Sequence, residues 1–170
     1  MSRPPVRWLT LAAMFTVLVN VATMAIHVPV PATQGIINLG DSMIFLTGLL
    51  AGPGMGAAAG GIGSALANLQ LGLTHWAPWT LVIKGLEGFI VGALGHRAFR
   101  SSGKVSPAVV VAVAVAGLWM ITGYFIAGSL MFGVPAALVE LPGNFVQAGG
   151  SALIGIPLAR ILHRVKLLSP

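Results

Sequence analysis

The sequence predicts an all-α membrane protein: a single integral membrane domain over residues 1–170, folded as a six-transmembrane-helix bundle with both termini in the cytoplasm. Three observations lead to this prediction. Hydrophobic residues make up 56% of the chain and charged residues only 7%, whereas a soluble domain carries about 25% charged residues. The apolar residues form long runs, and the basic residues form three clusters at the ends of those runs. The bilayer is therefore the natural solvent for this chain.

The basic clusters determine how many times the chain crosses the membrane. They lie at residues 3–7, 96–104 and 160–166, and the positive-inside rule places all three in the cytoplasm. An even number of crossings must then separate neighbouring clusters, which gives four before the second cluster and two after it. The expected helices cover about residues 7–27, 41–52, 54–72, 77–98, 107–132 and 137–163.

The helices follow from the lengths of the apolar runs and from the breaks between them. Residues 8–26 are too long for the apolar core of a signal peptide and precede a poor cleavage site, so they form a retained first span. Residues 42–73 hold about 30 apolar or small residues, fewer than the roughly 40 that two full spans need. Because this stretch must cross twice or not at all, we expect two short helices that break at residues 51–54, Ala-Gly-Pro-Gly. The last two apolar runs are joined by residues 133–135, Gly-Val-Pro.

Residues 28–35 connect the first two helices on the outer side. The alternating prolines, Pro29 and Pro31, are expected to keep this segment extended. It is apolar enough to fold back over the helix ends as a lid, and composition leaves open whether it is a lid or a plain loop.

Polar residues inside the apolar runs lie almost entirely in the predicted outer half of the bundle. Such residues are costly at membrane depth and normally face a cavity or another polar group. Lys84 and Glu87, three residues apart, share a helix face, and so do Asn144 and Gln147. A pore would need polar groups along its whole length, so this one-sided pattern predicts a pocket that opens to the outside. The expected ligand-binding residues are Asn38, His75, Trp79, Lys84, Glu87, Tyr124, Asn144 and Gln147.

Several polar and aromatic residues also have a purely structural interpretation. Lys84 and Glu87 could neutralise each other as an ion pair, with or without a ligand. Trp76 and Trp79 could stack on a ligand or lie at the membrane interface, and His75 is more typical of a solvated side chain than of a metal ligand. Asp41 is expected to cap a helix, because it precedes an apolar run, and contact with a ligand is the alternative.

Asn144 and Gln147 are the strongest candidates for ligand contact. They are uncharged, one helical turn apart and expected to face inward, and amides of this kind read the edge of a planar heterocycle well. Pro142 and Gly143, just before them, predict a distorted helix start that frees backbone groups for a ligand.

Missing residue types and motifs argue against other classes of protein. The chain has no cysteine, which excludes disulfides, thiolate chemistry and Cys-based metal sites. It has neither a phosphate-binding glycine loop nor a His-Glu-x-x-His motif. With three acidic residues, we expect no catalytic residues, no metal and no cofactor. The formal charge of +6 lies at the ends of the apolar runs, which indicates membrane topology and no nucleic-acid partner.

Five segments together resemble a known family of membrane proteins. They are residues 37–41 (INLGD), 48–53 (GLLAGP), 63–69 (GSALANL), 77–88 (APWTLVIKGLEG) and 142–147 (PGNFVQ). The pattern covers nearly the whole chain and resembles the substrate-binding S component of energy-coupling factor (ECF) vitamin transporters. It looks closest to the riboflavin-type branch, which includes members assigned to hydroxymethylpyrimidine and pyridoxine. Asn68 stands where that family commonly has Asp, so a charge-dependent role at this position is in doubt.

The resemblance implies partners and a transport cycle. Such S components are six-helix bundles in the prokaryotic cytoplasmic membrane that capture a vitamin outside, dock on a transmembrane T subunit bound to two ATPases, and topple to release it inside. The first external loop, here residues 28–35, acts as the lid, and helices four to six supply most ligand contacts. Docking uses an Ala-x-x-x-Ala pattern on the first helix, for which the nearest match here is Ala12 and Thr16, extended by Ala13.

The resulting hypothesis is a vitamin-binding subunit, surrounded by lipid and without catalytic activity. Its expected ligand is a small heteroaromatic such as hydroxymethylpyrimidine or a B6 vitamer. Three alternatives remain: an S component for riboflavin or thiamine, a solitary carrier, and a membrane enzyme. Inverted repeats would favour a carrier, and the two halves show no convincing one. An enzyme would have only Glu87 with His75 to start from.

Overall fold

The computed structural model describes residues 6–165. Within this range the chain forms six helices and one short β-hairpin, which confirms the predicted all-α class and number of helices. The elements are α1 (Val6–Ala25), β1 (His27–Val30), β2 (Gly35–Asn38), α2 (Gly40–Ala51), α3 (Pro53–Gln70), α4 (Ala77–Ser102), α5 (Pro107–Phe132) and α6 (Val134–Arg164).

Glycine and proline set most of the helix boundaries. Gly52, with a φ of 87°, is the only residue between α2 and α3, so the predicted break between these helices is confirmed. Gly103 ends α4 in the left-handed conformation, and its N–H donates to the Phe99 carbonyl, as expected for a glycine after a helix. Pro107 then begins α5, where its missing N–H costs no helical hydrogen bond.

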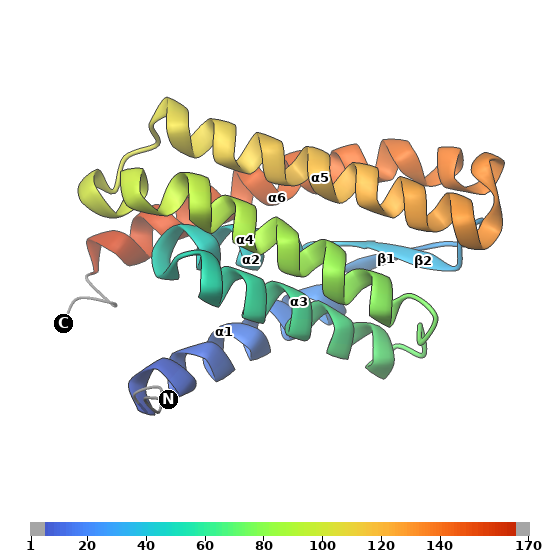
Figure 1. Ribbon diagram of the computed structural model, residues 1–170, viewed down its shortest axis with the longest axis horizontal. Coiled ribbons are helices and arrows are strands. Elements are labelled where there is room, and N and C mark those ends of the chain that lie inside the picture. Colours follow the sequence, from blue (N-terminus) through green and yellow to red (C-terminus); the bar gives the residue numbers. More distant parts are fainter. Residues whose placement is uncertain (1–5, 166–170) are drawn as a thin grey trace.

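Four helices of the described range, α1, α4, α5 and α6, are long and apolar enough to cross a membrane. The other two are α2, with 12 residues, and the glycine-rich α3, with 18 residues. The start of α1, the α2–α3 junction, the α4–α5 connection and the end of α6 lie at one end of the molecule (Figure 1). The hairpin turn and the α3–α4 and α5–α6 connections lie at the opposite end (Figure 1).

Helices α3 and α4 approach each other closely through glycine. A methyl group at Gly88 would collide with the Gly56 backbone carbonyl, and one at Gly60 would come within 2.6 Å of the Lys84 carbonyl. Such small-residue contacts let helix backbones pack without a gap. This packing fixes the α4 face that carries Lys84 and Glu87 toward the interior.

The segment that the sequence assigns to an extended connection is a hairpin. β1 pairs antiparallel with β2, with His27 opposite Asn38 and Val30 opposite Gly35. The prolines lie in β1 or its turn, where a short two-stranded edge tolerates them, and β-branched Ile36 and Ile37 favour the partner strand. In Figure 1 the hairpin extends along the bundle beyond the ends of α1 and α2.

The start of α6 differs from the sequence-based expectation. Residues 142–143 were expected to distort the first turn, but α6 begins at Val134 and Pro142 lies inside the helix. Pro135 occupies the first turn instead, where a proline is readily accommodated. Glu140, Asn144 and Gln147 therefore project from one face of an established helix.

Candidate ligand-binding site

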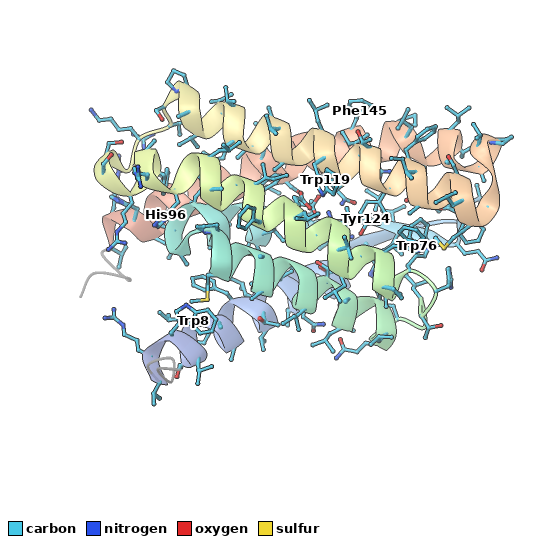
Figure 2. The ribbon with its side chains drawn as sticks, in the orientation of Figure 1. Trp8, Trp76, His96, Trp119, Tyr124 and Phe145 are labelled. Atoms are coloured by element: carbon cyan, nitrogen blue, oxygen red, sulfur yellow. The ribbon has the colours of Figure 1, made fainter. Side chains whose placement is uncertain are left out.

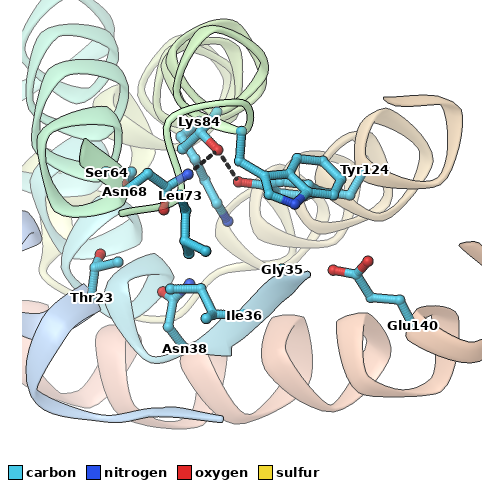
Figure 3. A pocket seen from close by; sticks show the side chains of 12 residues that line it. Thr23, Gly35, Ile36, Asn38, Ser64, Asn68, Leu73, Lys84, Tyr124 and Glu140 are labelled. Carbon is cyan, nitrogen blue, oxygen red and sulfur yellow. Dashed lines mark hydrogen bonds between the residues drawn. The ribbon is translucent and has the colours of Figure 1, made fainter. Parts of the chain in front are cut away.

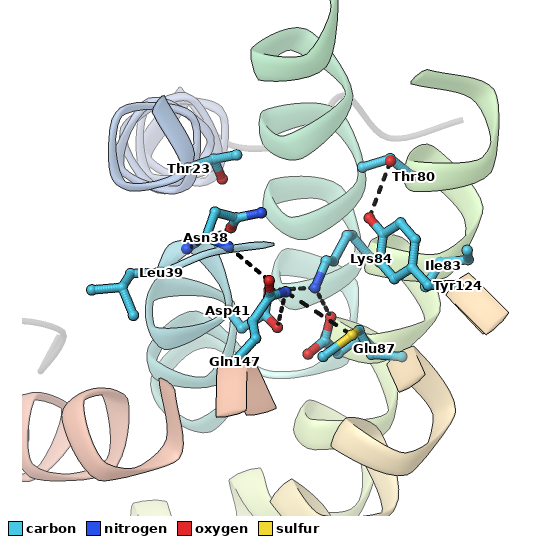
Figure 4. A network of polar contacts seen from close by, with 12 residues as sticks. Thr23, Asn38, Leu39, Asp41, Thr80, Ile83, Lys84, Glu87, Tyr124 and Gln147 are labelled. Atoms are coloured by element: carbon cyan, nitrogen blue, oxygen red, sulfur yellow. Dashed lines mark hydrogen bonds and ion pairs between the residues drawn. The ribbon is translucent and has the colours of Figure 1, made fainter. Parts of the chain in front are cut away.

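The three acidic residues of the chain, Asp41, Glu87 and Glu140, are all buried. Two of them share one lysine. The Lys84 ammonium pairs with Asp41 Oδ1 and lies 2.9 Å from Glu87 Oε2, and Figure 4 shows it between the two carboxylates. Buried charges are tolerated when they are paired in this way. The expected Lys84–Glu87 ion pair exists, and Asp41, from the start of α2, makes it a triad.

Asp41 corrects an expectation, because its side chain does not cap α2. The start of α2 has no side-chain cap hydrogen bond. The second carboxylate oxygen of Asp41 instead accepts a 2.9 Å hydrogen bond from Gln147 Nε2. The capping rule looks only at neighbours along the chain, whereas this aspartate is held by residues of α4 and α6.

Gln147 uses both ends of its amide within the protein. While Nε2 donates to Asp41, Oε1 accepts a 2.7 Å hydrogen bond from the backbone N–H of Asn38. The Asn38 side chain in turn accepts from the N–H of Gly40 at 2.9 Å. Gln147 thus links α6 to β2 and to the start of α2. Its orientation is fixed by these two bonds.

A second hydrogen-bonded group lies on the other side of Lys84. Thr80 Oγ1 lies 3.1 Å from the Tyr124 hydroxyl and accepts a 2.7 Å hydrogen bond from Asn68 Nδ2. The Lys84 ammonium lies 5.4 Å from the centroid of the Tyr124 ring, within the range of a cation–π contact. Lys84 therefore connects the acidic pair with an aromatic and amide group.

Some of these groups line an internal cavity (Figure 3), and the others lie behind its wall. Its wall includes Asn38, Lys84, Tyr124 and Glu140, together with Trp76, whose indole N–H donates to the Thr33 carbonyl at 3.1 Å. The free space is about 10 Å³, roughly that of one water molecule. A heterocycle can enter only if the side chains or the hairpin move.

A surface cleft lies between the hairpin and the α3–α4 connection. It has a volume of about 290 Å³ and is lined by hairpin residues and by Leu71 and Leu73. Gly35, Ile36 and Leu73 line both this cleft and the internal cavity. The hairpin and Leu73 thus separate the cavity from the cleft.

The structure brings together five of the eight residues expected to bind ligand: Asn38, Lys84, Glu87, Tyr124 and Gln147. The other three are part of neither this network of contacts nor the cavity wall. Asn144 is buried one turn before Gln147 but is not part of the cavity wall. His75 and Trp79 are exposed and do not line it either.

Asp41, Trp76 and Glu140 belong to this site but were not among the eight residues expected to bind ligand. Trp76 was expected at the membrane interface or on a ligand, but it is 2% exposed and packs beside Tyr124, with ring centroids 5.6 Å apart. Figure 2 shows these two rings at the same end of the bundle. The chain has only three acidic residues, and this rarity was the signal that could have identified Asp41 and Glu140 alongside Glu87.

The expected docking residues lie on α1. Ala13 is exposed, whereas Ala12 and Thr16 are partly covered by the bundle itself. A methyl group at Gly63 of α3 would come within 2.7 Å of the Thr16 carbonyl. This face of α1 is therefore only partly available to another protein.

Comparisons with known proteins agree with the resemblance noted in the sequence. The model of the family described as "ECF-type riboflavin transporter, S component" matches residues 5–164. A Pyrococcus woesei protein described as "Uncharacterized protein in gap 3'region" is 39% identical over 146 residues, which is 86% of this chain and 95% of that one. The thiamine precursor transporter HmpT of Lactococcus lactis subsp. cremoris (strain MG1363) is 29% identical over 163 residues, 95% of this chain and 89% of HmpT.

Proposed function

The chain belongs to the family of ECF-type riboflavin transporter S components, and from this premise we propose that it binds a thiamine precursor, hydroxymethylpyrimidine, for uptake. It is an integral membrane transport component of the cell membrane and not an enzyme. HmpT, a thiamine precursor transporter that is similar over nearly the whole chain, supports the choice of ligand. A B6 vitamer is the second candidate, followed by riboflavin or thiamine.

One observation carries the proposal: a network of charged and amide groups is buried beside a cavity in an otherwise apolar bundle. Lys84 is 1% exposed and lies in the cavity wall, and Glu87 is fully buried one turn deeper. Polar groups at membrane depth usually mark a ligand or ion pathway. Oε1 of Glu87 has no hydrogen-bond partner in the described structure, so a ligand donor would complete it.

We assign roles to the residues that surround the cavity. Lys84 and Glu87 bind the polar substituents of the ligand, while Tyr124 and Trp76 contact the faces of its ring. Gln147 and Asn38 hold this arrangement from α6 and β2. Asn144, in the next turn of α6, reaches the ring edge once the ligand has entered.

His75 and Trp79 remain proposed contacts at the entrance to the site. Both are exposed, and the His75 ring lies 6.3 Å from that of Trp76, measured between centroids. In this proposal they meet a ligand before it reaches the buried groups.

We further propose six membrane crossings with both ends in the cytoplasm. The basic residues Arg97, Arg100, Arg160 and Arg164 lie near the ends of α4 and α6, which share one end of the bundle (Figure 1). The positive-inside rule assigns that end to the cytoplasm. The hairpin then faces outside as a lid, and ligand passes from the cleft beside it into the cavity.

Transport in this proposal depends on a T subunit and two ATPases, which dock against α1 at Ala12, Ala13 and Thr16. Calorimetry with 4-amino-5-hydroxymethyl-2-methylpyrimidine tests the ligand, with one molecule expected per chain. Uptake in cells with and without the T subunit and ATPases tests the partnership. Absence of measurable binding would reject the ligand, and full uptake without the partners would instead indicate a solitary carrier.

A further inference from the structure

The carboxylates of the site outnumber its cations. Asp41, Glu87 and Glu140 share the interior with a single lysine, Lys84, whereas the other eight Lys and Arg residues of the chain lie in the three basic clusters at residues 3–7, 97–104 and 160–166. The region around the cavity thus holds three acidic side chains and one basic side chain, in a chain whose formal charge is +6.

Glu140 is the carboxylate without a cation. Lys84 pairs with Asp41 and Glu87, but Glu140 forms no salt bridge with any residue in the described range. It is 4% exposed and lies in the second turn of α6. The Thr33 hydroxyl is its neighbouring hydrogen-bond donor, but burying a carboxylate is costly unless an opposite charge or several donors compensate it. One neutral donor offsets only part of that cost.

The surroundings of Glu140 direct it toward the cavity. A methyl group at Gly35 would lie 3.3 Å from Glu140 Oε1, 3.3 Å from Trp76 Nε1 and 3.2 Å from Thr33 Oγ1. The absence of a side chain at Gly35 therefore leaves Glu140 open to the space between the hairpin and Trp76. Figure 3 shows the Glu140 carboxylate on the cavity side of α6, facing Tyr124 and the hairpin.

We infer that Glu140 is a ligand-binding residue that selects a ligand with N–H donors or positive charge and rejects phosphorylated forms. This inference rests on the proposed function. The ligand group that matches a carboxylate in this way is an amino group next to a ring nitrogen. The amine donates to one carboxylate oxygen, and the ring nitrogen shares a proton with the other, which gives the paired geometry of strong charge-assisted hydrogen bonds. A phosphate ester would bring a second anion beside a carboxylate that no cation of the described range pairs with.

Three probes distinguish this role in calorimetric binding to the purified full-length protein. They are 4-amino-5-hydroxymethyl-2-methylpyrimidine, its phosphate ester, and the analogue whose 4-amino group is replaced by a carbonyl. The wild type should bind the amino compound at least about tenfold more tightly than either analogue, since a hydrogen bond to a charged group supports that ratio. Glu140→Gln should weaken binding of the amino compound about tenfold and bring the phosphate ester closer to it.

Two variants make the result specific. Glu140→Asp keeps the charge and should keep the rejection of the phosphate ester while it loses affinity for the amino compound. Arg97→Gln also changes the net charge by one unit, but at an exposed position on α4 outside the cavity wall, and should leave all three affinities unchanged. Unfolding temperatures establish that each variant is folded.

The outcomes separate this inference from the proposed function. Unchanged ratios among the three probes in folded Glu140→Gln would overturn the role of Glu140 and leave the ligand assignment standing. If the wild type binds none of the probes, the ligand assignment fails and the inference fails with it.

Discussion

Gln147 Nε2 donates a 2.9 Å hydrogen bond to Asp41 Oδ2 across 106 residues of sequence. The same amide accepts from the N–H of Asn38, so one side chain joins α6, β2 and α2. This relationship makes Gln147 part of the framework around the cavity, whereas the sequence suggested only a ligand contact.

The first prediction concerns Gln147→Ala. The substitution leaves a buried N–H and a buried carboxylate oxygen without their partner, which should lower the free energy of unfolding by about 1–3 kcal/mol. Thermal unfolding of the detergent-purified protein measures this loss. Asn144→Ala is the matched control, because Asn144 is equally buried on the same helix. It should unfold near the wild-type temperature but bind ligand more weakly, and equal destabilisation by both variants would contradict the framework role of Gln147.

The second prediction concerns the charge triad. Lys84→Met removes the cation that faces Asp41 and Glu87 and should destabilise the protein by about 3–5 kcal/mol, since two buried carboxylates lose their partner. Thermal unfolding again provides the measurement. Adding Asp41→Asn and Glu87→Gln to Lys84→Met should recover most of the loss. If the triple variant is no more stable than Lys84→Met alone, charge pairing is not the cause.

The sequence predicted features that depend on composition and local chain geometry. The all-α class, six helices and the break at Gly52 follow from apolar run lengths and from glycine and proline. Lys84 and Glu87 were placed on a common helix face because they are three residues apart, and they do form an ion pair. Such relationships lie within one helix, where spacing determines which side chains meet.

Features that depend on contacts between distant segments could not be obtained in this way. Judged from the residues next to it in the sequence, Asp41 looks like a helix cap. Its hydrogen-bond partners, however, are 43 and 106 residues away in the sequence. The hairpin forms because residues 27–30 and 35–38 pair with each other. Pro29 in the first strand and Pro31 in the turn are unfavourable for a strand, so the sequence did not predict this pairing. Trp76 follows a loop, so no helical periodicity indicated that its ring would be buried.

The third prediction tests the close contact between α3 and α4. Gly88→Ala places a methyl group against the Gly56 carbonyl and should cost about 1–3 kcal/mol of stability, because two backbones must move apart. Chemical or thermal unfolding measures the change. Gly54→Ala is the control, since a methyl group there meets no atom within 4 Å. It should leave stability unchanged or raise it slightly, as alanine favours the helix.

The fourth prediction concerns the hydrogen bond that fastens the hairpin to the bundle. Trp76→Phe keeps the aromatic packing but removes the indole N–H that donates to the Thr33 carbonyl. Loss of one such bond should speed ligand release about 2- to 10-fold. Dissociation of a radiolabelled ligand measures this rate. Trp119→Phe is the control, because Trp119 donates to Ile83 of α4 at 3.0 Å and not to the hairpin. Equal rates in both variants would show that this bond does not retain the lid.

The last prediction concerns membrane topology, for which the absence of cysteine is an experimental advantage. Ala32→Cys places a single thiol in the exposed turn of the hairpin, and Ser101→Cys places one on the exposed end of α4. Because the hairpin is proposed to face outside, an impermeant maleimide should label Ala32→Cys on intact cells.

Ser101→Cys should react only after the membrane is permeabilised, since the positive-inside rule places its basic neighbours in the cytoplasm. Labelling of denatured protein confirms that both thiols are reactive. The reverse pattern would invert the bundle and direct the cleft beside the hairpin toward the cytoplasm. Labelling of both positions on intact cells would instead place the hairpin and the end of α4 on the same side of the membrane. The proposed topology has three crossings between them, α2, α3 and α4, so this result would contradict it.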